Sequence, residues 1–167
     1  IGLDRDAGIK SGESEGEAVV RGPASVIEDP RRRSLLGREV LVEDRDELGG
    51  LGPDVHVAHG VHVDADDRAL LRERQTVVAL CTRSNAVLQA GEAPVADYLT
   101  EGNPVALGTD SLASSPDLDL LAEARATRDL ARRQGLERPE EALVRALTLG
   151  GAQAVGQDLG TIREGAR

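Results

Sequence analysis

The sequence predicts an α/β protein made of parallel βα units, with helices packed outside a sheet. Three short runs have the composition of buried strands, and each is followed by a polar tip and then by a helical pattern. The runs are Val55–Ala58, Thr76–Cys81 and Val105–Leu107. Their repeat of about 25 residues is consistent with βαβ units, and strands that alternate with helices in this way pair in parallel.

The first two units each contain a helix with clear end signals. Asp64 is a good N-cap for a helix that continues to about Arg74. After the second strand, Thr82–Asn85 is predicted to be a loop. Pro94–Glu101 then has the pattern of a helix, and Gly102 ends it.

Two longer helices are predicted after the third strand. Asp117–Gln134 has an apolar stripe that we expect to face the core, formed by Leu118, Leu121, Ala122 and Leu130. Pro139–Thr148 is the second of these helices, and a short helix follows it up to Gly156.

Residues 1–54 carry weaker signals. The elements predicted there are short: a strand within Ile1–Lys10, a helix over Arg31–Leu36, a strand over Val40–Val42 and a helix over Asp44–Leu48. No linker or low-complexity tract divides the chain, so we expect residues 1–167 to form a single domain.

The composition limits the kinds of partner. A net charge of −10 argues against binding to nucleic acid or to an anionic membrane. The single cysteine, Cys81, excludes an internal disulfide and fits a reducing compartment. The sequence has no long apolar run and no signal-peptide pattern, so we expect a cytoplasmic protein. It also has no Phe, Trp or Met, so Leu, Val and Ala must build most of the core.

Two residues that can bind a metal or move a proton stand at the ends of predicted strands. His59 ends the first strand, and Asp110 ends the third. Because the carboxyl ends of parallel strands lie at one edge of a sheet, we expect the two side chains to converge. Together they suit zinc or another divalent cation, or an acid–base pair that orients a water. Asp110 alone also fits a residue that only caps a turn.

Other polar residues near these tips have simpler interpretations. His56 lies further back in its strand and is expected to pack there, and His62 fits a surface or capping residue. Cys81 is expected to act as a small buried hydrophobe. Ser84 and Asn85 are expected to tie their loop through local hydrogen bonds to the backbone.

Five spaced motifs resemble the amidohydrolase superfamily, in the branch that holds nucleoside and adenosylhomocysteine deaminases, aminofutalosine deaminases and s-triazine chlorohydrolases. They occur in the family order: Ala58-His-Gly-Val-His-Val63, Cys81-Thr-Arg-Ser-Asn85, Pro94-Val95, Gly102, and Leu107-Gly-Thr-Asp-Ser111 with Ala113-Ser114. The resemblance covers roughly residues 7–167. It implies the C-terminal half of a TIM-type (β/α)8 barrel. Residues 157–167 are similar to the start of the segment that leaves the barrel for a flanking β-sandwich.

The resemblance also implies roles for the strand tips. His59 would end the sixth barrel strand, Cys81–Asn85 would follow the seventh, and Asp110 would end the eighth. In the family, the eighth-strand Asp binds a single zinc or iron(II) ion and helps to deprotonate its water. The sixth-strand His is a metal ligand in some members and a partner of the water in others.

The chain departs from the family pattern in its N-terminal part. The His-X-His metal pair of the first barrel strand belongs to a half of the barrel that is not in this sequence. The fifth strand of the family ends in His-X-X-Glu, and the best match here is Lys10-Ser-Gly-Glu13. Glu13 fits the proton shuttle, but Lys10 stands at the position of the His, and an ammonium group has no lone pair for a metal.

Two functions are therefore open. The first is a metal-dependent hydrolase that deaminates a purine-like or nucleoside substrate, with Glu13, His59 and Asp110 as catalytic residues and Asp110 as a metal ligand. The second is a non-catalytic or truncated half barrel that lacks a complete metal site. The binding partner expected for the hydrolase is a small-molecule substrate. A half barrel would also associate with itself or with a chain that supplies the missing strands.

Overall fold

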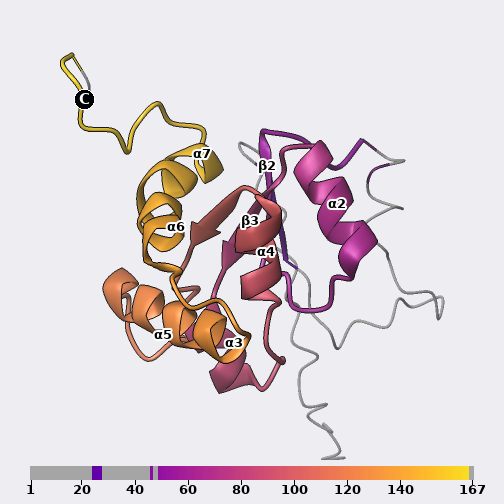
Figure 1. Cartoon of the computed structure of the whole chain (residues 1–167), viewed down its shortest axis with the longest axis vertical. Coiled ribbons are helices and arrows are strands. Elements are labelled where there is room, and N and C mark those ends of the chain that lie inside the picture. The colour runs from indigo at the N-terminus through magenta and orange to yellow at the C-terminus, as the bar shows by residue number, and fades with distance from the viewer. Residues whose placement is uncertain (1–23, 28–45, 47–48, 166–167) are drawn as a thin grey trace, which may run out of the picture.

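The computed structural model describes residues 24–27, 46 and 49–165. Four parallel strands lie in the order β1-β2-β3-β4. Their bounds are Ala24–Ile27 for β1, Val55–Ala58 for β2, Val77–Leu80 for β3 and Val105–Leu107 for β4. The three predicted strands and their parallel pairing are confirmed. Figure 1 shows the sheet in the middle of the molecule with helices around it.

Strand β1 is an addition that the sequence did not predict. It pairs with β2 in register from Ala24 opposite Val55 to Ile27 opposite Ala58. Its four residues include only two β-branched side chains and lie between Gly22-Pro23 and Asp29-Pro30, so the local signal is that of a turn region. The elements expected within Ile1–Lys10, Arg31–Leu36 and Val40–Val42, and most of the one at 44–48, lie outside the described residues.

The described helices follow the strands in order. They are α2 (Ala65–Glu73), α3 (Thr82–Leu88), α4 (Val95–Glu101), α5 (Leu120–Arg133), α6 (Glu140–Arg145), the π-helix η1 (Ala146–Gly150) and α7 (Gly151–Ala154). Asp64 caps α2 as predicted, in a reciprocal capping box with Asp67. None of the described helices is long and apolar enough to cross a membrane.

The core lies between one face of the sheet and the helices. Alternate residues of the strands point to this face, among them Val57, Val78, Leu80, Val105 and Leu107. The largest fully buried side chain is Tyr98 of α4, the only aromatic residue of the chain other than histidine. Its hydroxyl donates a hydrogen bond of 2.9 Å to the carbonyl of Gly60, which fixes the turn after β2.

Two expectations about helices were wrong. Thr82–Asn85 is not a loop but the first turn of α3, whose helical path depends on contacts with α5 described below. Leu118 and Leu121 do not face the core and are 61% and 63% exposed. Helix α5 starts at Leu120 after the N-cap Asp119, and its buried side is formed by Glu123, Thr127, Leu130 and Ala131.

The last two segments also differ from the simple prediction. The helix expected over Pro139–Thr148 is α6 followed by the π-helix η1, which brings Gly150 against the backbone of Val105. A Cβ atom at Gly150 would lie 1.9 Å from the Val105 carbonyl oxygen, so only glycine allows this approach. Residues 157–165 hold turns and bends, without a helix or strand in the described stretch.

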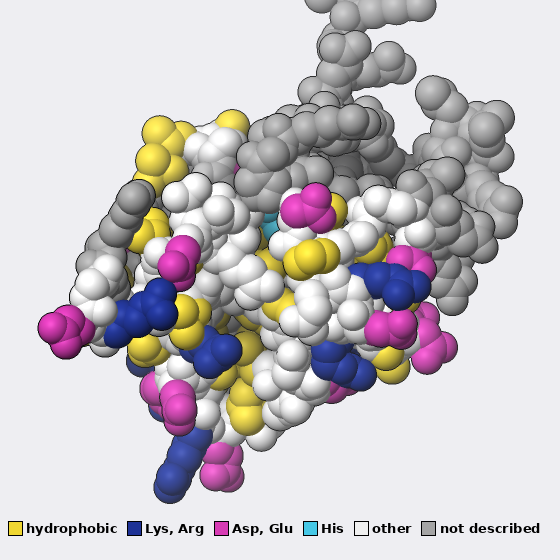
Figure 2. Space-filling view, turned by 90° about the horizontal axis from the view of Figure 1, so that it is seen from above, with side chains coloured by type: hydrophobic (Ala, Val, Ile, Leu, Met, Phe, Trp, Pro, Cys, Tyr) yellow, Lys and Arg dark blue, Asp and Glu magenta, His cyan; other side chains and the backbone are white. Residues whose placement is uncertain are grey.

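The described surface mixes both charge signs with apolar side chains. Figure 2 shows acidic and basic groups interspersed with hydrophobic ones over one face. Leu112, Leu118, Leu120 and Leu121 are all exposed and follow β4 in the chain.

Candidate functional site

The two predicted tip residues lie together at the carboxyl ends of their strands. His59 directly follows β2, and Asp110 follows β4 after Gly108 and Thr109. His59 Nε2 is 3.9 Å from Asp110 Oδ2. Both residues have left-handed backbones, with φ values of 68° and 61°. Such a conformation costs free energy in residues other than glycine, and its presence at two facing tips is typical of a functional site.

Asn85 of α3 sets the orientation of the His59 ring. Its Oδ1 atom lies 2.8 Å from His59 Nδ1. The amide oxygen accepts, so Nδ1 carries a proton, and in the neutral form of the ring Nε2 presents a lone pair. This lone pair is on the side of the ring that faces Asp110, and the His59 side chain is only 11% exposed.

Asp110 is held by neutral donors. Its Oδ2 atom accepts hydrogen bonds of 2.7 Å from Ser84 Oγ and 2.6 Å from Ser114 Oγ. Burial raises the pKa of Asp110. The hydrogen bonds from Ser114, Ser84 and the backbone N–H of Ser111, together with nearby His59, outweigh burial and hold this pKa below its ordinary value of 3.8. The carboxylate is therefore ionised at neutral pH.

A carboxylate and an imidazole lone pair thus face each other, and both are acceptors. Two acceptors at this distance repel each other unless a positive group or a proton donor lies between them. Two ligands of one zinc ion, each at about 2.0–2.2 Å, are about 3.4 Å apart at the tetrahedral angle and at most about 4.4 Å apart. The separation of 3.9 Å falls within this limit. The pair fits two positions of a divalent cation, or two acceptors of one water.

The other predicted residues are placed as follows. Cys81 is buried, and burial, with smaller effects of Asp110 and Glu123, raises the pKa of its thiol to about 12, so it is a packing residue as expected. His56 lies within β2, where burial lowers its pKa, and His62 is exposed after the tip. Lys10 and Glu13 lie outside the described residues.

The sequence interpretation missed the roles of three small polar residues. Ser84 and Asn85 were expected chiefly to tie their own loop, but they bind the tip residues that follow the two neighbouring strands. Ser114 binds Asp110 within the loop that follows β4. For Ser84 and Asn85 the available signal was their position, directly after a strand end that a parallel sheet brings to the same edge as the other strand ends. Within the described part of the chain, no group of three or more His, Cys, Asp or Glu residues is placed to hold a metal ion.

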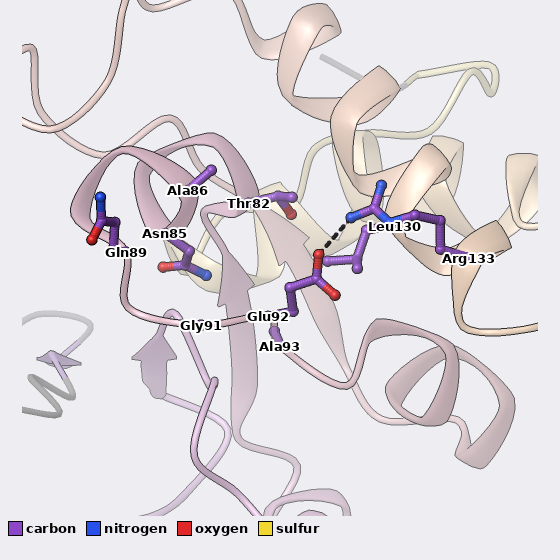
Figure 3. Close-up of a pocket in the computed structure, with 9 residues that line it drawn as sticks. All are labelled: Thr82, Asn85, Ala86, Gln89, Gly91, Glu92, Ala93, Leu130 and Arg133. Carbon is purple, nitrogen blue, oxygen red and sulfur yellow. Dashed lines mark hydrogen bonds and ion pairs between the residues drawn. The ribbon is translucent and has the colours of Figure 1, made fainter.

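A pocket of about 300 Å³, lined in part by Asn85, adjoins the site (Figure 3). It lies between α3, the segment after it, and α5. Glu92 and Arg133 form an ion pair of 2.6 Å across it. Asn85 is shared by the pocket wall and the His59 hydrogen bond.

Comparison with known proteins decides the family. The amidohydrolase family profile matches residues 32–167. The chain belongs to the amidohydrolase family.

Curated relatives in this family are similar over most of the chain. The chain is 42% identical over 131 residues to a 5-methylthioadenosine/S-adenosylhomocysteine deaminase of Natronomonas pharaonis. The aligned region covers 75% of this chain and 30% of that protein. It is 38% identical over 145 residues to the protein of the same name from Moorella thermoacetica, which covers 83% of the chain and 33% of the relative. The chain therefore spans about three tenths of the length of these relatives.

Solved structures agree with this placement. An adenosine deaminase from Xanthomonas campestris with bound zinc superposes with a TM-score of 0.69 at 31% identity, over 73% of this chain and 29% of that one. An atrazine chlorohydrolase from Arthrobacter aurescens complexed with zinc gives a TM-score of 0.65 at 26% identity, over 72% of this chain and 28% of that one.

Proposed function

We propose that this chain carries one side of a metal-dependent deaminase site for a purine nucleoside or a related substrate. The observation that supports the proposal most strongly is the facing pair of acceptors, His59 Nε2 and Asp110 Oδ2, at the strand ends. The relatives named as deaminases of 5-methylthioadenosine and S-adenosylhomocysteine suggest the substrate class. The zinc-bound relatives suggest the cofactor, with iron(II) as the other candidate.

The protein groups have distinct tasks in the proposed reaction. A divalent cation held by Asp110 and His59 would act as a Lewis acid and make a bound water more acidic. Asp110 accepts a proton from the water, and Ser84 and Ser114 hold its carboxylate in place for this transfer. His59, with its lone pair fixed by Asn85, orients the same water. The water oxygen adds to the ring carbon that bears the amino group, and one of its protons is transferred to the amino nitrogen. The carbon–nitrogen bond then breaks and ammonia leaves, while the second proton of the water remains on a ring nitrogen of the oxo product.

The wider architecture is part of the proposal. The four described strands would belong to the C-terminal half of a (β/α)8 barrel, in which His59 ends the sixth strand and Asp110 the eighth. Glu13 would be the proton shuttle at the fifth strand, and residues 157–167 would lead to a flanking β-sandwich. This half would bind a small-molecule substrate together with the remaining strands of the barrel, supplied by the same polypeptide or by association with a second chain.

A second candidate function is a non-catalytic half barrel. It rests on Lys10, which stands where family members have a histidine next to the metal. A protonated lysine there would place a positive charge close to the cation and would form an ion pair with Asp110 or Glu13 instead. On this basis we expect the chain by itself to bind zinc weakly and to deaminate slowly or not at all.

Zinc titration tests both functions. Calorimetry on the wild type and on Lys10→His should show higher zinc affinity in the variant, because a neutral imidazole replaces an ammonium group. Tight stoichiometric binding by the wild type would contradict the second function, and no gain in the variant would contradict the placement of Lys10. Ammonia release from 5-methylthioadenosine, measured in Lys10→His with zinc, should exceed that of the same variant carrying Asp110→Asn. Equal rates in the two would contradict the first function.

A further inference from the structure

A carboxylate behind the site has no role in the chemistry proposed so far. Glu123 of α5 is fully buried, with 0% of its surface exposed. Its Oε1 atom accepts a hydrogen bond of 2.9 Å from the backbone N–H of Arg83. Its Oε2 atom has no hydrogen-bond partner within the described residues. A buried carboxylate with one satisfied oxygen is costly, so a packing role alone does not explain it.

The hydrogen bond to Arg83 supplies a cap that α3 lacks. The residue before the helix, Cys81, makes no side-chain capping hydrogen bond. The first N–H groups of a helix have no partner within the helix, and an acceptor at this end stabilises it. Glu123 provides that acceptor from another helix, 40 residues further along the chain.

A second link joins the same turn of α3 to α5. Thr82 Oγ1 lies 2.8 Å from Thr127 Oγ1, and Thr127 Oγ1 donates to the backbone carbonyl of Glu123 at 2.9 Å. The first turn of α3 is therefore fixed at two consecutive residues, Thr82 and Arg83. The next two residues in the chain are Ser84 and Asn85, which bind Asp110 and His59.

We propose that Glu123 is a positioning residue of the candidate site: it caps α3 from α5 and so holds Ser84 against Asp110 and Asn85 against His59. Among the described residues, no hydrogen bond joins Glu123 directly to His59 or Asp110. It acts through a chain of hydrogen bonds in which every donor and acceptor is named above. Its effect is to keep the His59 ring in the form that has a proton on Nδ1 and a lone pair on Nε2.

The tautomer of His59 tests this inference directly. Long-range proton–nitrogen NMR on the full chain, with a chelator present and at one pH where the ring is neutral, reports which ring nitrogen carries the proton. We expect the Nδ1–H form in the wild type and a mixture of both forms in Glu123→Leu, which has no acceptor for the Arg83 N–H. Glu123→Gln retains an acceptor oxygen and should restore the wild-type spectrum.

Matched variants separate positioning from stability. Leucine at position 123 fills the buried space without an unpaired carboxylate, so this variant is expected to fold. Asp129→Leu removes an exposed acidic residue of the same helix and should leave the His59 spectrum unchanged. An unchanged His59 tautomer in Glu123→Leu would overturn the inference, as would a change that Glu123→Gln fails to reverse.

The inference rests on the proposed function only through the shared site, and the two can fail separately. A wild-type chain with the expected tautomer but no zinc-dependent deamination would contradict the function and leave the role of Glu123 intact. A wild-type chain with the proton on Nε2 would overturn both, because the bond between Asn85 and His59 underlies each.

Discussion

Two partly exposed carboxylates in this protein are stabilised in opposite ways. Glu101, at the end of α4, receives a two-point hydrogen bond from Arg68, with distances of 3.0 and 2.8 Å, and lies 3.6 Å from Arg72. Asp110, at the end of β4, receives two serine hydroxyls and faces an imidazole lone pair. Both have a pKa below the ordinary value.

The difference separates a structural carboxylate from one that can act on a ligand. The charge of Glu101 is neutralised by a guanidinium group of its own chain, so nothing remains for a ligand to satisfy. The hydroxyls around Asp110 hold the carboxylate in place but do not cancel its charge. The charge of Glu101 is already balanced by Arg68. The charge of Asp110 still needs a cation or an acidic proton to balance it.

The largest effect should come from removing the charge of Asp110. Asparagine tolerates the left-handed backbone at this position, so Asp110→Asn should keep the fold. In the Lys10→His background, we expect deamination to fall by a factor of about 10² to 10⁴, the usual contribution of a positioned acid or base. Zinc-induced changes in the amide NMR signals near His59 should also be lost.

Glu101→Gln is the control for this prediction. It removes a carboxylate of similar burial and should leave both the zinc response and the rate unchanged. If Glu101→Gln reduced the rate as strongly as Asp110→Asn, the distinction between the two carboxylates would be wrong.

A smaller effect, on stability instead of activity, is expected for Arg68→Leu. The Arg68 side chain is 10% exposed and its loss leaves Glu101 without its main partner. We expect the free energy of unfolding at neutral pH to fall by about 1 kcal/mol, because the Glu101 side chain is 31% exposed and water can solvate its carboxylate once Arg68 is lost. Denaturant unfolding of the two proteins measures this difference.

The pH dependence of that loss has a definite sign. The hydrogen bond from Arg68 is the largest cause of the low pKa of Glu101, whose ordinary value is 4.5. A carboxyl with a lowered pKa in the folded state stabilises the protein above its unfolded-state pKa, and this contribution disappears as the pH falls through the folded-state value. The difference in the free energy of unfolding between wild type and Arg68→Leu should therefore become smaller below about pH 4.5. A gap that is constant or widens in acid would show that Arg68 acts through packing alone.

The smallest effect is expected for a single hydroxyl at the site. Ser114→Ala removes one of the two hydroxyl donors to Asp110 Oδ2 and leaves Ser84 in place. We expect zinc affinity in the Lys10→His background to fall about tenfold, as is typical when a partner of a metal ligand is lost. Ser111→Ala, whose exposed side chain is not among these donors, is the matched control. Equal affinities in the two serine variants would contradict the support role of Ser114.

The parallel arrangement of β2, β3 and β4 and the two tip residues could be predicted from local features of the sequence. Strand and helix periods, the cap at Asp64 and the position of His59 and Asp110 after apolar runs are all local features, readable within a few residues. Parallel pairing then brings the strand ends to one edge without further information. The predicted meeting of His59 and Asp110 follows from this rule alone.

The surroundings of these two residues could not be predicted, because they are built from contacts between distant parts of the chain. Ser84 and Asp110 are 26 residues apart, as are His59 and Asn85, and Arg83 and Glu123 are 40 apart. The helix Thr82–Leu88 is capped by a residue of α5. The packing of α5 buries Glu123 and leaves Leu121, which was expected to face the core, exposed. Hydrogen bonds over such separations have no local signature in the chain, because they form between side chains that only the completed fold brings into reach.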